Sequence, residues 1–291
     1  MLIAGCPGAI ELAKRIARKV KSHYSNVEIG TFPDGETNLR FTRPVKGQHV
    51  ILVQTMRPAN ENMMEAMFAA YTARDLGAKK VTLIAPYLAY MREDKRFHSG
   101  ECISARVMAR LLSAAFDRII TIDPHLHRFH KLSEIFSIPA ARVTAAGIIG
   151  QYVKRNIRGA VIIGPDEESD QWAEEVAKVA KVPADVLTKT RYSSVHVEIH
   201  FRSGESYKRK HAVLVDDIIS TGHTMMETIK QLKRMGVKRI TCIGVHGLFT
   251  DDAYPKMKKM GVKIVTANTI SHPTNGIDVS GLLKDALGRW S

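Results

Sequence analysis

The sequence predicts an α/β protein made of two tandem domains, each a mainly parallel sheet flanked by helices. The first observation behind this prediction is an alternation of short β-rich runs with amphipathic stretches along the chain. Such alternation is typical of βαβ units, whose parallel strands are covered by helices on both faces. The runs predicted to be strands are Val27–Phe32, Val50–Gln54, Lys80–Ala85, Arg118–Ile122, Ala160–Ile163, Ala184–Thr188, His211–Val215, Arg239–Gly244 and Ile264–Ala267.

The second observation is an internal repeat. VILVQ at Val50–Gln54 resembles AVLVD at Ala212–Asp216, and each is followed by MME at the same spacing. Further on, GAKKVTLIAPYL in the first copy corresponds to GVKRITCIGVHGL in the second. We therefore predict two related domains, residues 1–144 and 145–291. Chance similarity between two βαβ units is the alternative, because the identities are short.

Composition limits the class of protein. A chain of 291 residues, 45% hydrophobic and 25% charged, is typical of a soluble globular protein. Nothing resembles a signal peptide or a membrane-spanning run, so we expect a cytoplasmic protein without a membrane partner. Three scattered cysteines argue against a disulfide framework or a zinc site. The net charge of +14 is spread along the chain, which favours small polyanions such as nucleotides and sugar phosphates and makes nucleic acid a minor alternative.

The stretch Ala212–Met225 (AVLVDDIISTGHTM) carries the strongest functional signal. A buried strand leads into two adjacent carboxylates, Asp216 and Asp217, and then into a turn before a helix. Backbone N–H groups at a helix start bind phosphate, and the acids suggest hydroxyls to bind, a Mg²⁺ ion, or both. A solvated acidic turn is the alternative. The turn consists of Ser220, Thr221, Gly222, His223 and Thr224.

This stretch closely resembles the phosphoribosyl-diphosphate (PRPP) motif shared by type I phosphoribosyltransferases and PRPP synthetases. The resemblance implies that each domain has the type I phosphoribosyltransferase-like fold. It also implies that Asp216, Asp217 and the turn bind ribose 5-phosphate. The first copy reads QTMRPANEN where the second reads DDIISTGHT, so only the second copy keeps the acids and the glycine turn.

Two segments of the first domain resemble the ATP-binding segments of PRPP synthetases. The first segment is FPDGE at Phe32–Glu36, and its alternative interpretation is an ordinary β-turn. The second is the basic run within Ala85–Ser104, and its alternative interpretation is a solvated loop. An aromatic ring can stack on a purine and a carboxylate can accept from its amino group. Glu93 stands where the family usually has Gln, so it would accept hydrogen bonds rather than donate them. The resemblance assigns ATP binding to Phe32, Asp34, Gly35, Glu36, Arg92, Glu93 and Asp94, with Tyr90 and Lys95 also matching.

The resemblance places Mg²⁺ at His125 and Asp166. His125 lies in DPHLHRFH after a predicted strand, where the histidine spacing does not make a helical zinc motif. Asp166 follows another strand, at the edge where ligands bind in open α/β sheets. Acids at a helix start also complement its dipole, which is the alternative for Asp166. Glu168 and Ser169 replace glycines common in the family, so we expect a different local turn here.

KTRYSS, from Lys189, precedes an alternating segment and is predicted to be the tip of a β-arm; a solvated hairpin is the alternative. PRPP synthetases carry a catalytic Lys and Arg at this point, which Lys189 and Arg191 match, and Arg191 would also contact ribose 5-phosphate. Together the segments resemble the PRPP synthetase family, which implies ATP and ribose 5-phosphate as substrates, Mg²⁺ as cofactor and a homo-oligomer. A PRPP-consuming phosphoribosyltransferase and a non-catalytic regulatory subunit are the alternatives.

Overall fold

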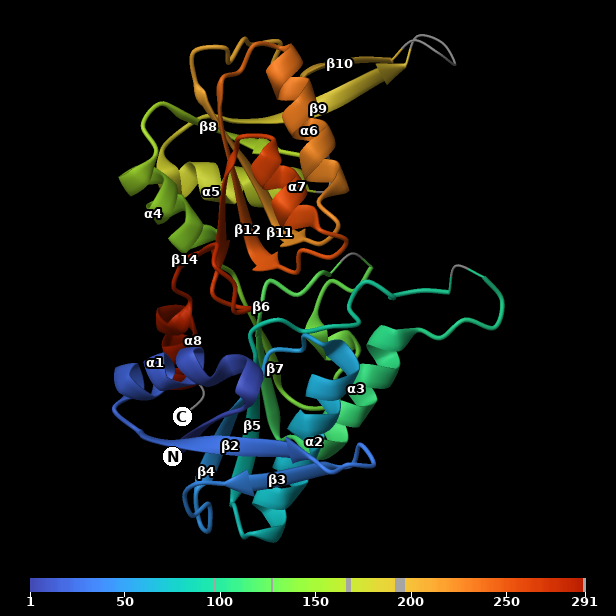
Figure 1. The fold of residues 1–291 in the computed structure, drawn as a ribbon, viewed down its shortest axis with the longest axis vertical. Helices are drawn as coiled ribbons and strands as arrows, with labels where there is room; N and C mark the ends of the chain where they lie inside the picture. Colours follow the sequence, from blue (N-terminus) through green and yellow to red (C-terminus); the bar gives the residue numbers. More distant parts are fainter. Residues whose placement is uncertain (97, 127, 166–168, 192–196, 290–291) are drawn as a thin grey trace. The chain divides into compact units, whose positions relative to one another are not determined.

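A computed structural model describes residues 1–291 except 97, 127, 166–168, 192–196 and 290–291 (Figure 1). The chain folds as two compact units. The first unit comprises Met1–Thr144, Thr269–Ser271 and Asp278–Ser291, and the second comprises Ala145–Asn268 and His272–Ile277. The predicted second domain ran to residue 291, whereas the C-terminal segment from Asp278 packs with the first unit.

The first unit contains a seven-stranded sheet in the order β3-β2-β1-β4-β5-β6-β7. Its strands are β1 (Leu2–Gly5), β2 (His23–Thr31), β3 (Thr37–Phe41), β4 (His49–Val53), β5 (Lys80–Ala85), β6 (Arg118–Ile122) and β7 (Ala140–Val143). Its helices are α1 (Ile10–Val20), α2 (Ala59–Asp75), α3 (Ser104–Ala115), α8 (Ser280–Gly288) and the 3₁₀ turns η1 (Pro7–Ala9) and η2 (Leu132–Glu134). Helices α1 and α8 contact each other, as do α2 and α3, so the helices cover the sheet in pairs (Figure 1).

The second unit contains a seven-stranded sheet in the order β10-β9-β8-β11-β12-β13-β14. Its strands are β8 (Ala160–Gly164), β9 (Ala184–Arg191), β10 (Val197–Phe201), β11 (His211–Ile219), β12 (Arg239–Gly247), β13 (Lys263–Ala267) and β14 (Asn275–Ile277). Its helices are α4 (Ala146–Asn156), α5 (Asp170–Ala180), α6 (His223–Arg234) and α7 (Ala253–Lys259). Strands β9 and β10 form a long two-stranded arm that extends from the sheet (Figure 1).

The two sheets repeat one topology. Each has the same strand order, and among the strands that the structure describes only the pairing with the edge strand, β3 or β10, is antiparallel. Side chains repeat too: the His49 ring bonds to Thr82 Oγ1 at 2.8 Å, and the His211 ring bonds to Thr241 Oγ1 at 2.8 Å, at equivalent places in the two sheets. The predicted fold class, two related domains with mainly parallel sheets, is confirmed.

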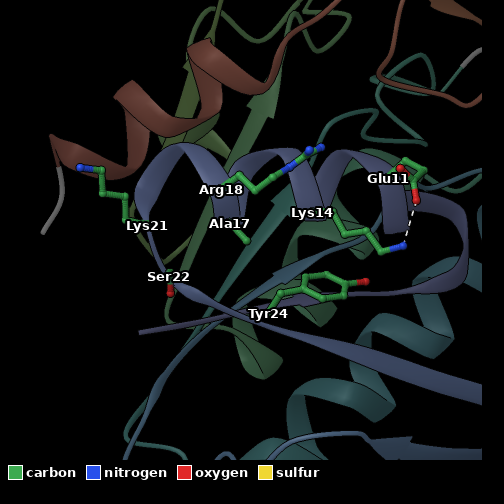
Figure 2. A pocket seen from close by; sticks show the side chains of 7 residues that line it. All are labelled: Glu11, Lys14, Ala17, Arg18, Lys21, Ser22 and Tyr24. Atoms are coloured by element: carbon green, nitrogen blue, oxygen red, sulfur yellow. Dashed lines mark hydrogen bonds and ion pairs between the residues drawn. The ribbon is translucent and has the colours of Figure 1, made fainter.

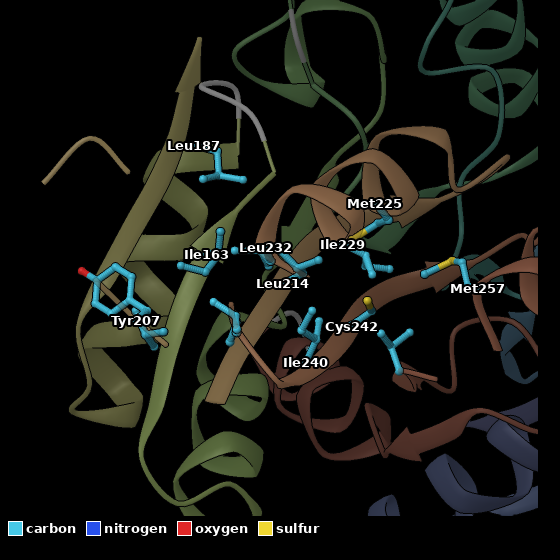
Figure 3. Packing of buried hydrophobic residues seen from close by; sticks show 14 of the residues in the cluster. Ile163, Leu187, Tyr207, Leu214, Met225, Ile229, Leu232, Ile240, Cys242 and Met257 are labelled. Atoms are coloured by element: carbon cyan, nitrogen blue, oxygen red, sulfur yellow. The ribbon is translucent and has the colours of Figure 1, made fainter. Parts of the chain in front are cut away.

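The core of the second unit fixes where helix α6 starts. Met225, Ile229 and Leu232 lie one helical turn apart and point to Leu214 and Cys242 on the sheet (Figure 3). All five side chains are buried. Burying each such apolar side chain stabilises the fold by about 1.5–3 kcal/mol. Because Met225 is anchored in this core, the first turn of α6 is held against the end of β11.

All nine predicted strands occur, with two differences that concern the site. Strand β11 continues to Ile219, so Asp216 and Asp217 lie within the strand and not beyond its end. Strand β9 continues to Arg191. The short strands β1, β3, β7 and β14 were not among the predicted runs, because strands of three to five residues carry little periodicity.

The paired histidines give a prediction for stability. Burial, and then the cations Lys80 and Arg118, lower the pKa of His49. Burial, Arg239 and Lys263 lower the pKa of His211 in the same way. Below about pH 6.5 the unfolded chain therefore binds more protons than the folded chain, and the free energy of unfolding falls as the pH decreases towards the folded pKa values.

We expect the double variant His49→Gln/His211→Gln to lose less stability than the wild type between pH 7 and pH 5, as measured by urea unfolding. At pH 8 both imidazoles are neutral in either state, so the two proteins differ there only by the altered hydrogen bonds and packing. Parallel pH profiles for the two proteins would contradict the prediction.

Candidate functional site

The turn after β11 presents a helix N-terminus to solvent. Gly222 precedes α6 with φ +68°, a left-handed conformation that glycine adopts without strain. A Cβ at Gly222 would lie 3.1 Å from Met257 Sδ and 3.3 Å from Ala253 Cβ, so the turn is also closely packed from behind. The Thr221 hydroxyl accepts from the His223 N–H at 3.4 Å.

Thr221, His223 and Thr224 are exposed on this turn. Among the residues that the structure describes, the N–H groups of Thr224 and Met225 donate no hydrogen bond. Free N–H groups, hydroxyls and the positive end of a helix dipole form an anion site. The turn therefore has the chemistry of a phosphate site, which needs no enclosed cavity.

The carboxylates Asp216 and Asp217 are half-buried in the last part of β11. Asp216 lies opposite Gly244 of β12. Successive side chains of a strand point to opposite faces, so Asp216 shares the face of Leu214 and Asp217 shares that of Val215. The two acids and the turn form one continuous segment of the second unit, as the sequence predicted.

Three neighbouring strands of the second unit end at this edge of the sheet. Strands β8, β9 and β11 are parallel, so their carboxyl ends lie on the same side. Lys189 and Arg191 lie at the end of β9, and Lys189 is paired with Ile199 of β10. Asp166, which follows β8, lies outside the described residues. In an open α/β sheet this edge, where strand order reverses, is where ligands bind.

The base of the β9–β10 arm is held by a buried carboxylate that the sequence analysis missed. Asp185 is 2% exposed and accepts hydrogen bonds from the N–H groups of Val186 (2.8 Å) and Ser203 (3.3 Å) and from the hydroxyls of Ser203 and Tyr207. A fully bonded buried carboxylate stabilises one local arrangement. The only sequence signal was an acid at the start of an apolar strand.

The predicted ATP segments lie in the first unit. Phe32–Glu36 is the tip of the β2–β3 hairpin, closed by hydrogen bonds from Phe32 N–H to Glu36 O and from Gly35 N–H to Phe32 O, both 2.8 Å. Gly35 has φ +93°, and Phe32 is 50% exposed. The turn predicted from composition is therefore present, and its aromatic ring is free to stack on a planar ligand.

The basic loop after β5 divides into exposed and buried parts. Arg92 and Glu93 are exposed, whereas Asp94 is 8% exposed. The Asp94 carboxylate accepts from the Arg128 N–H at 3.1 Å and lies 3.7 Å from the Arg128 guanidinium. In this structure Asp94 therefore joins the loop after β5 to the loop after β6, and its predicted contact with ATP stays a prediction.

His125 follows β6 and is half-buried. Strands β2, β4, β5 and β6 run in one direction, so the hairpin tip, the basic loop and His125 all belong to the carboxyl edge of the first sheet. Within the described ranges, no three His, Cys, Asp or Glu side chains gather as a metal site. Mg²⁺ commonly uses one or two carboxylates together with substrate phosphates, so the carboxylates of β11 fit such an ion without a preformed cage.

A cavity of about 510 Å³ lies elsewhere in the first unit. It is formed by α1 and the start of β2, and Lys14, Arg18 and Tyr24 are among its lining residues (Figure 2). No predicted site residue lines it. Lys14 is paired with Glu11 at 3.0 Å, and the cations Arg18 and Lys21 flank the negative end of α1, which accounts for their presence there.

Fold and site together define a protein of two phosphoribosyltransferase-like domains, of which the second carries the phosphate turn. Comparison with known proteins agrees. Residues 1–115 match the model for the N-terminal domain of ribose phosphate pyrophosphokinase, and residues 131–282 match the model for the phosphoribosyl transferase domain. The chain belongs to the ribose-phosphate pyrophosphokinase family and is an enzyme, as the sequence predicted.

The similarity extends over the whole chain. The ribose-phosphate pyrophosphokinase of Methanopyrus kandleri is 34% identical, with 100% of each chain covered. That of Methanothermobacter thermautotrophicus is 34% identical, with 98% of this chain and 99% of the relative covered. The crystal structure of phosphoribosylpyrophosphate synthetase from Mycobacterium smegmatis superposes with a TM-score of 0.84 at 25% identity, covering 99% and 98% of the two chains. In the described residues, none of the helices has the length and apolar character needed to cross a membrane.

Proposed function

We propose that this enzyme transfers the diphosphoryl group of ATP to the 1-hydroxyl of ribose 5-phosphate, giving PRPP and AMP. The observation that carries the proposal is that Asp216 and Asp217, in the last part of β11, lead directly into the phosphate turn, in a chain that matches this family over its full length. The sugar hydroxyl attacks the β-phosphorus, its proton is released, and the bond from the β-phosphorus to the α-phosphate oxygen breaks.

The second unit supplies the groups for the sugar phosphate. The turn from Ser220 to Thr224 binds the 5-phosphate through N–H groups and hydroxyls, because these donors face solvent at a helix start. Asp216 and Asp217 accept hydrogen bonds from the ribose hydroxyls or hold them through Mg²⁺. Lys189 and Arg191 stabilise the negative charge that develops on the transferring phosphoryl oxygens.

The first unit supplies the groups for ATP. The exposed Phe32 ring stacks on the adenine, and Asp34, Gly35 and Glu36 form the hairpin tip that presents the ring. Asp34 already accepts from the Glu36 N–H at 3.1 Å, which rigidifies the tip. Beyond the tip, Arg92 is exposed and can bind phosphate oxygens as a fork, with Glu93 and Asp94 beside it.

We assign Mg²⁺ binding to His125 in the first unit and to Asp166 in the second, where the carboxylates of β11 would be further oxygen ligands. Mg²⁺ bound with the triphosphate neutralises charge on the phosphoryl oxygens. Each named residue would orient the ion or the phosphates. The preference of Mg²⁺ for oxygen ligands makes the carboxylates the stronger part of this set.

One reaction tests the proposed function. The purified protein is incubated with Mg²⁺, ATP and ribose 5-phosphate, and AMP, ADP and PRPP are separated by chromatography. We expect AMP and PRPP in equal amounts. ADP would indicate a simple kinase and overturn the mechanism, whereas absence of turnover would favour a regulatory subunit or a PRPP-consuming transferase.

We also propose that the enzyme is a homo-oligomer, because the outer face of α2 exposes three large apolar side chains. Ala66, Ala69, Ala70 and Ala73 are buried against the sheet side of the helix, while Met64, Phe68 and Tyr71 are exposed at helical spacing on the other side. Val107 and Leu111 of the contacting helix α3 are exposed as well. An apolar patch on two adjacent helices is typical of a surface covered by another protein molecule.

The variant Phe68→Glu is expected to dissociate the oligomer into smaller species in sedimentation velocity, since it places a charge within the patch. Val179→Glu is the matched control: Val179 is an exposed valine of α5, outside the patch. If both variants sediment like the wild type, the α2–α3 surface is not the subunit contact.

A further inference from the structure

The turn after β12, from Leu248 to Asp252, is held against the end of β11. The N–H groups of Leu248 and Phe249 both donate to Ile219 O, at 2.9 and 3.1 Å. Ile219 is the last residue of β11 and immediately precedes Ser220 of the phosphate turn. The two turns therefore share one anchoring carbonyl, and the position of one is coupled to the position of the other.

The turn after β12 adopts a conformation that only tight packing maintains. Phe249, Asp251 and Asp252 have φ of +48°, +53° and +58°, in the left-handed region that is costly for residues with a Cβ. The Phe249 ring packs 4.5 Å from the His272 ring and 5.6 Å from the Tyr254 ring, measured between centroids. Backbone strain of this kind persists where the surrounding residues hold the backbone in place. The fixed backbone in turn sets the direction of the side chain between Phe249 and Asp251.

That side chain is Thr250. Its Oγ1 lies 3.3 Å from Ser220 Oγ, and among the described residues no other hydrogen-bond partner of Ser220 Oγ occurs. Each hydroxyl has a single proton to donate. If the Thr250 hydroxyl donates to Ser220 Oγ, the proton of Ser220 is directed outward from the turn. A chain of two hydroxyls ending on an anion is polarised along its length and binds that anion better than an isolated hydroxyl.

We propose that Thr250 is a positioning residue for the phosphate of the sugar substrate: its hydroxyl donates to Ser220 and thereby orients Ser220 to donate to the 5-phosphate. This inference rests on the proposed function, in which the Ser220–Thr224 turn binds ribose 5-phosphate. Thr250 does not itself contact the substrate. Its effect should appear in sugar phosphate binding and not in the chemical step or in ATP binding.

The test compares Thr250→Val, which keeps the shape and removes the hydroxyl, with Thr250→Ser, which keeps the hydroxyl. We expect Thr250→Val to raise the KM for ribose 5-phosphate about five- to tenfold, the effect of losing one hydrogen-bond partner. The kcat and the KM for ATP should change less than twofold, and Thr250→Ser should restore the wild-type KM. Thr241→Val is the matched control, because Thr241 lies near the start of β12, at the end away from the turn that carries Thr250, and bonds to His211.

A double-mutant cycle with Ser220→Ala separates positioning from general support of the fold. If Thr250 acts through Ser220, the double variant binds ribose 5-phosphate no more weakly than Ser220→Ala alone. Additive losses, an equal loss of kcat, or a similar KM change in Thr241→Val would overturn the inference. Binding of ribose 5-phosphate is also measured by calorimetry. A wild type that binds ribose 5-phosphate without turnover would refute the proposed function, and the binding data would still test the role of Thr250. A wild type that does not bind ribose 5-phosphate would refute both.

Discussion

Replacing Lys189 with alanine is expected to lower kcat by about 100- to 1,000-fold, the usual effect of removing one group that stabilises developing charge. The KM for ribose 5-phosphate should change less than about threefold, since in the proposed function the phosphate turn and the carboxylates of β11 bind the sugar. Steady-state measurement of AMP formation with each substrate varied separates the two effects. A loss confined to kcat is the signature of an interaction made mainly in the transition state.

Lys208→Ala is the matched control for Lys189→Ala. Lys208 is an exposed lysine that follows the β9–β10 arm, and its removal subtracts the same charge from the second unit. The control is expected to keep the wild-type kcat. A Lys189 variant with near-normal kcat, or an equal loss in the control, would refute the assigned role and leave only a general effect of the net positive charge.

The arm that carries Lys189 shows what the sequence could and could not predict. The spacing of Lys189 and Arg191 and the alternation that follows indicated a β-arm, because these are local properties of a short segment. The support of the arm by Asp185, Ser203 and Tyr207 joins residues far apart along the chain, and no spacing rule connects them. These hydrogen bonds to Asp185 depend on the register between β9 and β10.

The same distinction applies to the fold. Strands within the sheets were predictable because buried parallel strands are continuous apolar runs. The packing of α8 with the first unit was not, since a helix of nine residues carries no information about which sheet it covers. The position of Asp94 was not predictable either. Its neighbours in the sequence are basic and indicate a solvated loop, yet its carboxylate is buried and accepts a hydrogen bond from Arg128. Tertiary contacts decide such positions, and local pattern does not record them.

The length of β11 determines which faces of the strand Asp216 and Asp217 occupy. The sequence placed them beyond the strand, where both could face one ligand. Because the strand continues to Ile219, the acids alternate between its faces, and a ligand at the carboxyl edge meets them from two sides. We therefore assign different contacts to the two: one carboxylate binds the ribose hydroxyls directly, and the other holds them through Mg²⁺.

Asp216→Asn and Asp217→Asn are each expected to lower kcat/KM for ribose 5-phosphate by about 10- to 100-fold, the range for a lost hydrogen bond to a charged group. Asparagine keeps the shape of the side chain and removes its charge, so folding should be preserved. Raising the Mg²⁺ concentration should recover activity in only one of the two variants. Neutralising the carboxylate that acts through Mg²⁺ weakens binding of the ion, and a higher Mg²⁺ concentration compensates for that loss. Neutralising the other carboxylate leaves Mg²⁺ binding unchanged. Glu227→Gln, which alters an exposed ion pair with Lys230 on α6, should behave as the wild type. Recovery by Mg²⁺ in both variants would show that both acids act through the ion, and recovery in neither would show that both bind the sugar directly.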